Sequence, residues 1–347
     1  MFSALHGVKI NSIVVMPDFF VDRLIKLSSQ EEFSRLLAEK VKFGGGSIRN
    51  ISTTERKGGN AVNIAYCLGK LGIRTTLFTV ADELGSAMLE KVFAKFGDTV
   101  RLKIGSGKHG RTTGLEFLRD GYNKANVMLN DAGDNEYFGP DKIESQENLK
   151  ILEDADAVMV VNWGSNLRGT ELAQYVFKKS PTSFHFIDPA DIEIRREEFR
   201  DFLLKISNYI NDLSLNENEA NSLGKSLGMD SVLPPNNYDE QNVKNAAKQI
   251  STKIGINIDV HTRIGAGWSN GTDSQFAPAI KVEAKTLTGA GDSWDSASIV
   301  GYLCKLSPIA RLMFSNAYAS LYVQSSDAEP PTMEATLDLL NTKPPIR

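Results

Sequence analysis

The sequence predicts an α/β fold with a mostly parallel sheet that is covered by helices on both faces. Short apolar runs of strand length, such as those at 9–16, 73–81 and 155–164, alternate with amphipathic helical stretches along most of the chain. Most of these runs end in polar residues or glycine. Such alternation is typical of parallel sheets, in which ligand-binding groups gather at the carboxyl ends of the strands.

The elements follow one another in a regular order. The first strand, at 9–16, is rich in β-branched residues and is broken by Pro17 and Asp18. A helix is predicted in "NAVNIAYCLGKLG" at 60–72, because apolar residues recur there at every third or fourth position and Gly72 ends the pattern. Further strands are predicted in the apolar runs 73–81, 155–164, 182–190, 208–216 and 255–265, mostly with helices between them, and a last helix follows 331.

Two segments depart from this alternation. The stretches 41–54 and 110–131 read as antiparallel strand pairs, and the second turns at Asp120-Gly121, a hairpin signal. We expect a small accessory sheet, with strands from about 17–57 and 110–130, that forms a lid over a site or a dimer surface. We further expect one domain spanning 1–347 and a homodimer through the lid, because exposed sheet edges pair readily.

Composition excludes several classes of function. The formal net charge of −4 argues against nucleic acid as a partner, because such binding needs clustered Lys and Arg. Cys67 and Cys304 are too few for a disulfide framework, and the four histidines form no zinc motif. No apolar stretch is long enough for a signal peptide or a membrane span, so we expect a cytoplasmic protein without a membrane partner.

The stretch "KTLTGAGDSWDSASIVGYL" at 285–303 places glycines and an acid at the start of a predicted helix. The first N–H groups of a helix lack intrahelical partners, so Gly289, Ala290 and Gly291 could offer them to a phosphate. Asp292 has two possible roles, a helix cap or a general base that takes a proton from a substrate hydroxyl. Thr288 or Ser293 could also cap this helix.

The stretch "LNENEAN" at 215–221 holds Asn216 and Glu219 three residues apart after an apolar run. At that spacing both side chains can lie on one face of a first helical turn and hold a hydrated Mg²⁺ through oxygen ligands. The alternative is a capping box, in which the two side chains serve only the helix start.

A third polar cluster lies in "ERKGGNAVNIA" at 55–65. Gly58 and Gly59 permit close backbone approach to a ligand, and Asn60 and Asn63 could hydrogen-bond sugar hydroxyls. The alternative is a turn followed by a helix cap. Asp22 could accept hydrogen bonds from substrate hydroxyls or simply be solvated.

Together, "GGNAVNIAYCLGKLG", "LNENEA" and "TGAGDSWDSA" resemble the three ordered motifs of the ribokinase-like (PfkB-type) carbohydrate kinase family, over roughly residues 8–335. The resemblance implies a ribokinase-like three-layer sandwich with a small β-sheet lid. It also implies ATP- and Mg²⁺-dependent transfer of a γ-phosphoryl group to a sugar or nucleoside. By the resemblance, Asp292 is the base, Gly289, Ala290 and Gly291 form the anion hole, Asn216 and Glu219 organise Mg²⁺ and phosphate, and Asp22, Gly58, Gly59 and Asn63 hold the acceptor.

The sequence departs from the family pattern at three places. Thr286 stands where D-x-x-G-A-G-D begins with Asp. In "HTRIGAG", which stands in place of a T-L-G-type nucleotide loop containing Gly265, either Thr262 or Arg263 would meet the phosphates. Phe20 stands where ribose kinases have Asn, and could stack on a base or a sugar face.

These observations favour a Mg²⁺- and ATP-dependent kinase that acts on a sugar, a sugar acid or a nucleoside. An ADP-dependent sugar kinase of the same fold is the alternative among enzymes. A non-catalytic sugar- or nucleotide-binding regulator is the alternative from another class, motivated by Thr286 and the altered loop.

Overall fold

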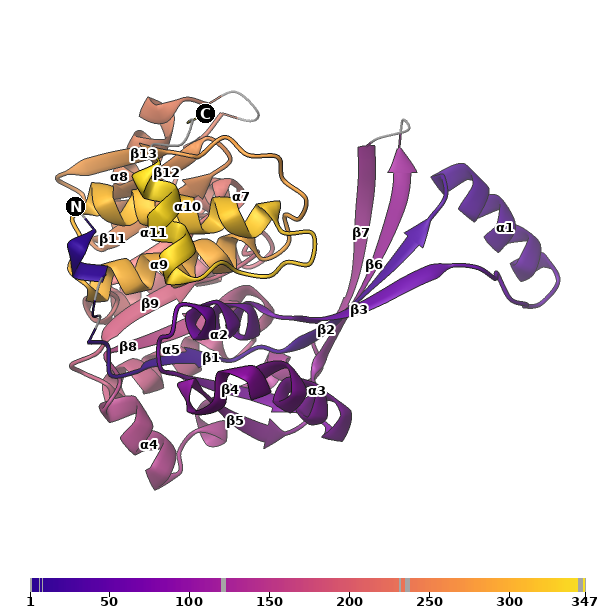
Figure 1. The fold of residues 1–347 in the computed structure, drawn as a ribbon, viewed down its shortest axis with the longest axis horizontal. Coiled ribbons are helices and arrows are strands. Elements are labelled where there is room, and N and C mark those ends of the chain that lie inside the picture. Colours follow the sequence, from indigo (N-terminus) through magenta and orange to yellow (C-terminus); the bar gives the residue numbers. More distant parts are fainter. Residues whose placement is uncertain are drawn as a thin grey trace.

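The central sheet of the computed structural model is mostly parallel, as predicted. The structure describes residues 2–5, 7, 9–119, 123–230, 232–234, 238–342 and 346. Within these residues, nine strands pair in the order β13-β12-β11-β10-β9-β8-β1-β4-β5 (Figure 1). Only the β11–β12 and β12–β13 pairings of this described sheet are antiparallel. The strands are β1 (Ile13–Met16), β4 (Thr75–Ala81), β5 (Val100–Ser106), β8 (Ala157–Val161), β9 (Phe184–Asp188), β10 (Asp212–Leu215), β11 (Asn257–Thr262), β12 (Gly265–Ser269) and β13 (Ser274–Pro278).

Helices cover both faces of this sheet, which confirms the predicted layers. Along β1, Val14 and Met16 join one hydrophobic core, while Ile13 and Val15 join the other, because successive side chains of a strand point to opposite faces. The first core is closed by α4 (Gln146–Glu153), α5 (Gly169–Lys179), α6 (Arg196–Ile206), α7 (Glu217–Ser226) and α8 (Glu240–Ile254), and the second by α2 (Asn60–Lys70), α3 (Glu83–Phe93), α9 (Ala290–Leu303), α10 (Pro308–Gln324) and α11 (Met333–Asn341). In the described part of the chain, no helix combines the length and the apolar character needed to cross a bilayer.

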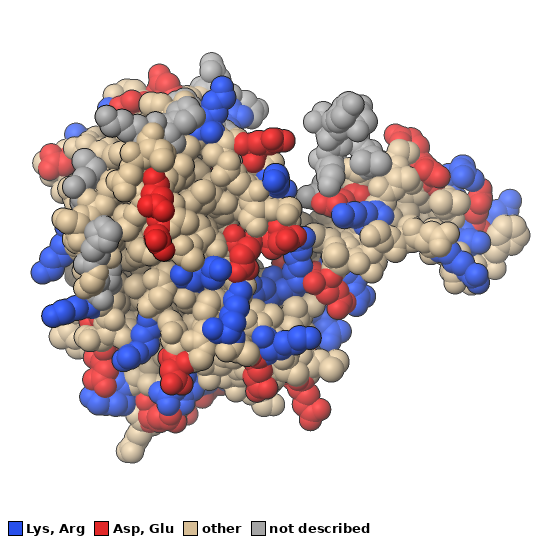
Figure 2. Space-filling view, viewed as in Figure 1, with Lys and Arg blue, Asp and Glu red and all other residues tan. Residues whose placement is uncertain are grey.

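A second, smaller sheet projects from the body as a lid (Figure 1). Its strands are β2 (Phe20–Leu27), β3 (Ser52–Gly58), β6 (Gly110–Arg119) and β7 (Asn123–Asp131), in the order β3-β2-β6-β7. The β2–β3 and β6–β7 pairs are antiparallel, and β2 runs parallel to β6. Lys, Arg, Asp and Glu side chains border the hollow between the body and the lid (Figure 2).

The prediction of a strand pair within 41–54 was wrong. The first lid hairpin pairs β2 with β3, and α1 (Gln30–Lys42) lies between these strands at the outer end of the lid. Ser29 caps α1 by accepting a hydrogen bond from the N–H of Glu32. Strand β2 lies within the range 17–57 predicted to supply lid strands, but its pairing with β3 was not predicted, because polar and charged residues interrupt its apolar pattern. The predicted turn at Asp120-Gly121 lies outside the described residues.

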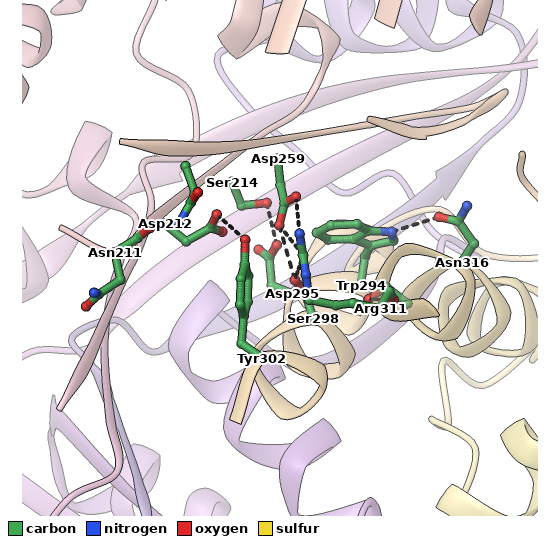
Figure 3. A network of polar contacts seen from close by, with 12 residues as sticks. Asn211, Asp212, Ser214, Asp259, Trp294, Asp295, Ser298, Tyr302, Arg311 and Asn316 are labelled. Atoms are coloured by element: carbon green, nitrogen blue, oxygen red, sulfur yellow. Dashed lines mark hydrogen bonds and ion pairs between the residues drawn. The ribbon is translucent and has the colours of Figure 1, made fainter. Parts of the chain in front are cut away.

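A buried polar network ties α9 to the sheet and to α10 (Figure 3). The Arg311 guanidinium donates to both carboxylate oxygens of Asp259, at 2.8 Å from Nη2 to Oδ1, and lies 3.8 Å from the centre of the Tyr302 ring. Tyr302 donates to Asp212 at 2.7 Å. Burial and the neighbouring Asp259 raise the pKa of Asp212 well above its usual value. The last helical turns of α9 are thereby fixed against β10 and β11.

The first turns of α9 are fixed in the same way. Ser214 on β10 donates to Asp295 at 2.5 Å, and the Trp294 indole donates to Asn316 on α10 at 2.9 Å (Figure 3). All four side chains are buried. Because these bonds engage α9 near both of its ends, they fix the helix against the sheet and α10.

Replacing Arg311 should destabilise the protein strongly. Arg311→Met leaves the buried Asp259 carboxylate without its cation, so the free energy of unfolding should fall by about 3–5 kcal/mol. Equilibrium unfolding in urea measures this change. The matched control is Arg35→Met, which breaks an exposed ion pair with Glu39 and should cost less than about 1 kcal/mol. Equal effects of the two substitutions would contradict a structural role of the network.

Candidate active site

A cavity of about 1190 Å³ lies between the lid and the carboxyl ends of the central strands. Because pockets for one small molecule usually have about 300–1000 Å³, it has room for two substrates. Of the predicted site residues, it is lined by Asp22, Gly59, Asn63, Asn216, Glu219, Gly289, Gly291 and Asp292. Gly58 and Ala290 lie beside lining residues in the chain.

Helix α9 begins at this cavity without a side-chain cap. Its N-cap position is Gly289, whose left-handed backbone, with φ of 82°, favours glycine. A Cβ atom at Gly289 would lie 2.4 Å from the Tyr322 hydroxyl. Asp292 and Thr288 do not cap the helix, and the Ser293 hydroxyl donates to the Ala290 carbonyl instead. The N–H of Ala290 is not free, because it donates to the Leu287 carbonyl at 3.1 Å. The N–H groups of Gly291 and Asp292 have no partner among the described residues and are left for a ligand.

Asp292 is the third residue of α9 and is only 6% exposed. Its Oδ2 accepts a hydrogen bond from the Asn63 amide at 2.9 Å. Burial and the nearby Asp188 raise the pKa of Asp292 well above its usual value, against the lowering effects of Asn63 and Lys57. A carboxyl group with a raised pKa is suited to proton transfer near neutral pH.

Helix α2 also begins at the cavity, and Asp18 caps it from a distance. The Asp18 carboxylate accepts hydrogen bonds from the N–H groups of Asn60 at 2.8 Å and Ala61 at 2.9 Å, and from the Asn162 amide at 2.9 Å. The Asn60 side chain donates onward to Asp188 at 3.3 Å. The start of this helix is therefore capped, but by Asp18 and not by an asparagine.

Two glycines bring β3 against acidic side chains. A Cβ atom at Gly58 would lie 2.2 Å from Oδ2 of Asp22, and one at Gly59 would lie 2.8 Å from the carbonyl oxygen of Asp18. Gly59 also has φ of 95°, a conformation that disfavours other residues. Close packing of the lid strand on these acids therefore requires both glycines.

Asn216 and Glu219 form the capping box that was the alternative to a magnesium site. The Asn216 side chain accepts from the N–H of Glu219 at 3.0 Å, and the Glu219 carboxylate accepts from the N–H of Asn216 at 2.8 Å. Burial and nearby Asp188 raise the pKa of Glu219 well above its usual value. Among the described residues, no group of three or more His, Cys, Asp or Glu is placed to hold a metal ion.

Thr262, Arg263 and Gly265 do not line the cavity and instead form the turn between β11 and β12. Thr262 donates to the Gly265 carbonyl at 2.7 Å, and Arg263 lies 5.5 Å from the centre of the Tyr238 ring. His261, one residue earlier, lines the cavity, as do Thr286 and Phe20.

Asp18, Lys57, Asn162 and Asp188 are among the cavity-lining side chains that sequence reasoning missed. Asp18, Asn162 and Asp188 lie at or just after the ends of β1, β8 and β9, where ligand groups of a parallel sheet gather. Reading each strand end for polar residues would have found these three. Lys57 carries no such signal, because it lies within a charged stretch of β3.

The raised pKa of Asp292 predicts how its replacement affects stability. A carboxyl whose pKa rises on folding stabilises the native state least at high pH, because the unfolded chain ionises first. Asp292→Asn should therefore melt at a higher temperature than the wild type at pH near 8, and the difference should shrink toward pH near 4, close to the pKa of about 3.9 for Asp in unfolded chains.

Thermal unfolding across this pH range measures the difference. Asp98→Asn removes an exposed carboxylate and serves as the control for the change in net charge. A melting difference between wild type and Asp292→Asn that did not change with pH would show that burial does not raise the pKa of this carboxyl.

The comparisons with known proteins identify a family and a shared fold. The model of the pfkB family carbohydrate kinases matches residues 32–335. Among curated proteins, none matches the chain. The fold is shared with solved structures across nearly the whole length of both chains. The ribokinase of Arabidopsis thaliana in complex with ribose and ATP has 20% identity and a TM-score of 0.71, and covers 96% of this chain and 99% of its own.

Two further structures show the same fold. The ribokinase of Thermotoga maritima has 20% identity and a TM-score of 0.70, with 95% of this chain and 98% of its own covered. The adenosine kinase of Sinorhizobium meliloti has 16% identity and a TM-score of 0.70, with 97% of this chain and 100% of its own covered. The predicted ribokinase-like fold is therefore confirmed.

Proposed function

Because the chain belongs to the pfkB family of carbohydrate kinases, we propose that it transfers the γ-phosphoryl group of ATP to a hydroxyl group of a sugar, a sugar acid or a nucleoside. One observation carries this proposal: the uncapped start of α9 and the buried carboxyl of Asp292 face the same cavity. Unpaired N–H groups suit a phosphoryl group, and an adjacent carboxylate suits the hydroxyl that attacks it.

Asp292 is the proposed base. It takes the proton of the acceptor hydroxyl while the N–H groups at Gly289 and Gly291 stabilise charge on the phosphoryl oxygens. The Ala290 N–H would join them only by leaving the Leu287 carbonyl. Asp22 on the lid lines the same cavity as Asp292 and would bind other hydroxyls of the acceptor. Since the transition state of phosphoryl transfer is loose, positioning and charge stabilisation supply most of the rate enhancement.

The residues present fit a magnesium ion that is bound through water. Both carboxylate oxygens of Glu219 already accept hydrogen bonds from Asn216, so these two side chains would hold the water shell of the ion. Mg²⁺ usually keeps several waters and binds nucleotide phosphates rather than an all-protein cage. When bound, it supplies neutralisation of the β- and γ-phosphate charges.

The nucleotide donor is proposed to be ATP. The similar Arabidopsis ribokinase structure holds ATP, which supports this choice. The turn of Thr262, Arg263 and Gly265 directly follows the cavity residue His261 and would approach the nucleotide from the edge of the site. Thr286 lines the cavity and would replace the family Asp beside the phosphates.

Asp292→Asn should abolish phosphoryl transfer without abolishing nucleotide binding. Turnover of the best acceptor, found by screening sugars, sugar acids and nucleosides with Mg²⁺ and ATP, should fall by about 10²–10⁴-fold, the usual contribution of a general base. The variant should still melt at a higher temperature when Mg²⁺ and ATP are added, because ligands stabilise the native state.

Other outcomes of these measurements would contradict the mechanism or favour one of the alternative functions. Wild-type turnover by Asp292→Asn would contradict the mechanism. A larger melting shift and turnover with ADP as the donor would favour the ADP-dependent alternative. Binding of nucleotide without turnover by the wild type, across the whole acceptor panel, would favour the non-catalytic regulator.

The lid also supports the expected homodimer. Strand β7 is an edge of the described lid sheet, and its Val127, Met128 and Leu129 are 47%, 40% and 55% exposed. Val127→Lys with Leu129→Lys should convert a dimer into a monomer in analytical ultracentrifugation, because charge on an edge strand opposes pairing. Leu204→Lys on α6, where the leucine is 50% exposed, is the control. A monomeric wild type would contradict this expectation.

A further inference from the structure

Strand β3 brings a lysine to the same place as the proposed base. Lys57 precedes Gly58 and Gly59, and it lines the cavity. Because Gly59 adopts φ of 95°, the chain turns there from β3 directly into α2. Lys57 therefore lies beside the first turn of α2, where its Nζ donates to Oδ1 of Asn63 at 2.8 Å.

Asn63 joins this lysine to Asp292. The Nδ2 group of Asn63 donates to Oδ2 of Asp292 at 2.9 Å, so the amide lies between an ammonium group and a carboxylate. In this orientation the carbonyl oxygen accepts from the cation and the NH₂ group donates to the anion, whereas a flipped amide would satisfy neither. A continuous chain of hydrogen bonds thus crosses from β3 through α2 to α9.

An aromatic ring also holds the Lys57 ammonium group in place. Its Nζ lies 4.3 Å from the centre of the Tyr66 ring, a favourable cation–π distance. Tyr66 lies one turn after Asn63 on the same face of α2, and its hydroxyl donates to Glu329 at 2.7 Å. The ring is thereby fixed, and the ammonium group is held against Asn63 rather than free to extend into the cavity.

The surroundings of Asp292 are otherwise acidic. Several titratable groups interact electrostatically with its carboxyl. They are Asp18 after β1, Lys57 on β3, Cys67 on α2, Asp188 on β9, Glu219 on α7, Asp295 on α9 and Tyr322 on α10. Burial and Asp188 raise the pKa of Asp292, while Asn63 and Lys57 lower it. Lys57 is thus the cation among these groups. Burial lowers the pKa of its own ammonium group, and Asp292 is among the acids that raise it again.

One carboxylate oxygen is left for the acceptor. Oδ2 of Asp292 is occupied by Asn63, while Oδ1 accepts no hydrogen bond from the described residues. We propose that Lys57 is a positioning residue: through the Asn63 amide, it keeps the Asp292 carboxylate ionised and turned so that Oδ1 meets the acceptor hydroxyl. This inference rests on the proposed kinase function. The acceptor proton passes to Oδ1 as the new O–P bond forms, and the bond to the β-phosphate oxygen breaks and leaves its electrons on ADP.

The experiment measures kcat and KM for the best acceptor as a function of pH. Lys57→Met should move the acidic limb of the profile about one pH unit upward and lower kcat/KM about tenfold at pH values below that limb, since each unit is there a tenfold change in the ionised fraction. The loss should fall on kcat, while KM for the acceptor changes little. Lys57→Arg should restore the acidic limb, because it restores the charge.

Two further variants separate positioning from folding. Lys57→Gln keeps a hydrogen-bond donor near Asn63 without the charge, and should show the same upward shift even if Lys57→Met folds poorly. Lys248→Met replaces an exposed lysine of α8 and should leave the profile unchanged. In an Asp292→Asn background, Lys57→Met should cause no further loss of kcat.

An acidic limb that stays at its wild-type position in both Lys57→Met and Lys57→Gln would overturn the inference. A loss confined to KM would overturn it as well, because it would make Lys57 an acceptor ligand. These results differ from a failure of the proposed function itself, which would appear as a wild type that phosphorylates no acceptor.

Discussion

Helix α9 starts at the cavity with N–H groups that no side chain caps, and a buried carboxyl follows within its first turn. The neighbouring helices behave differently, because Asp18 caps α2 and Asn216 caps α7. The helix start at which a phosphoryl group would bind therefore lacks a stabilising side-chain cap, whereas the other two helix starts have one. The left-handed Gly289 and the buried bonds of Ser214, Asp295 and Arg311 hold α9 in this position.

Several acidic side chains lie close together at the cavity, and burial disfavours their ionisation. Burial raises the pKa values of Asp292 and Glu219, which line the cavity, and Asp188 adds to both shifts. Such clusters of perturbed groups mark functional sites more often than structural ones. Mg²⁺ and Lys57 are the sources of positive charge that we infer to act on Asp292, although Lys26, Arg56 and Lys285 also line the cavity. Lys57 is a permanent feature of the chain, whereas the ion would arrive with the nucleotide.

Much of this arrangement could be predicted from sequence. Strand and helix periodicities predicted the sheet, and three ordered motifs predicted which loops meet, because parallel strands bring their carboxyl ends together. Prediction failed where contacts between distant segments of the chain determine the structure. Strand β2 gains its pairing from β3 and β6 despite a charged pattern, and α1 connects β2 to β3 at the outer end of the lid. The contact of Lys57 with Asn63 depends on a turn at Gly59 whose direction no local pattern specifies.

The central claim is that the start of α9 binds the phosphoryl group in transfer while Asp292 faces the attacking hydroxyl. A crystal structure with Mg²⁺, ADP, aluminium fluoride and the acceptor tests it most directly, because the fluoride mimics the phosphoryl group. We predict that the fluoride lies at the N–H groups of Gly289, Ala290 and Gly291, and that Oδ1 of Asp292 lies within hydrogen-bond distance of one acceptor hydroxyl. A fluoride bound elsewhere, or a hydroxyl directed away from Asp292, would contradict the account.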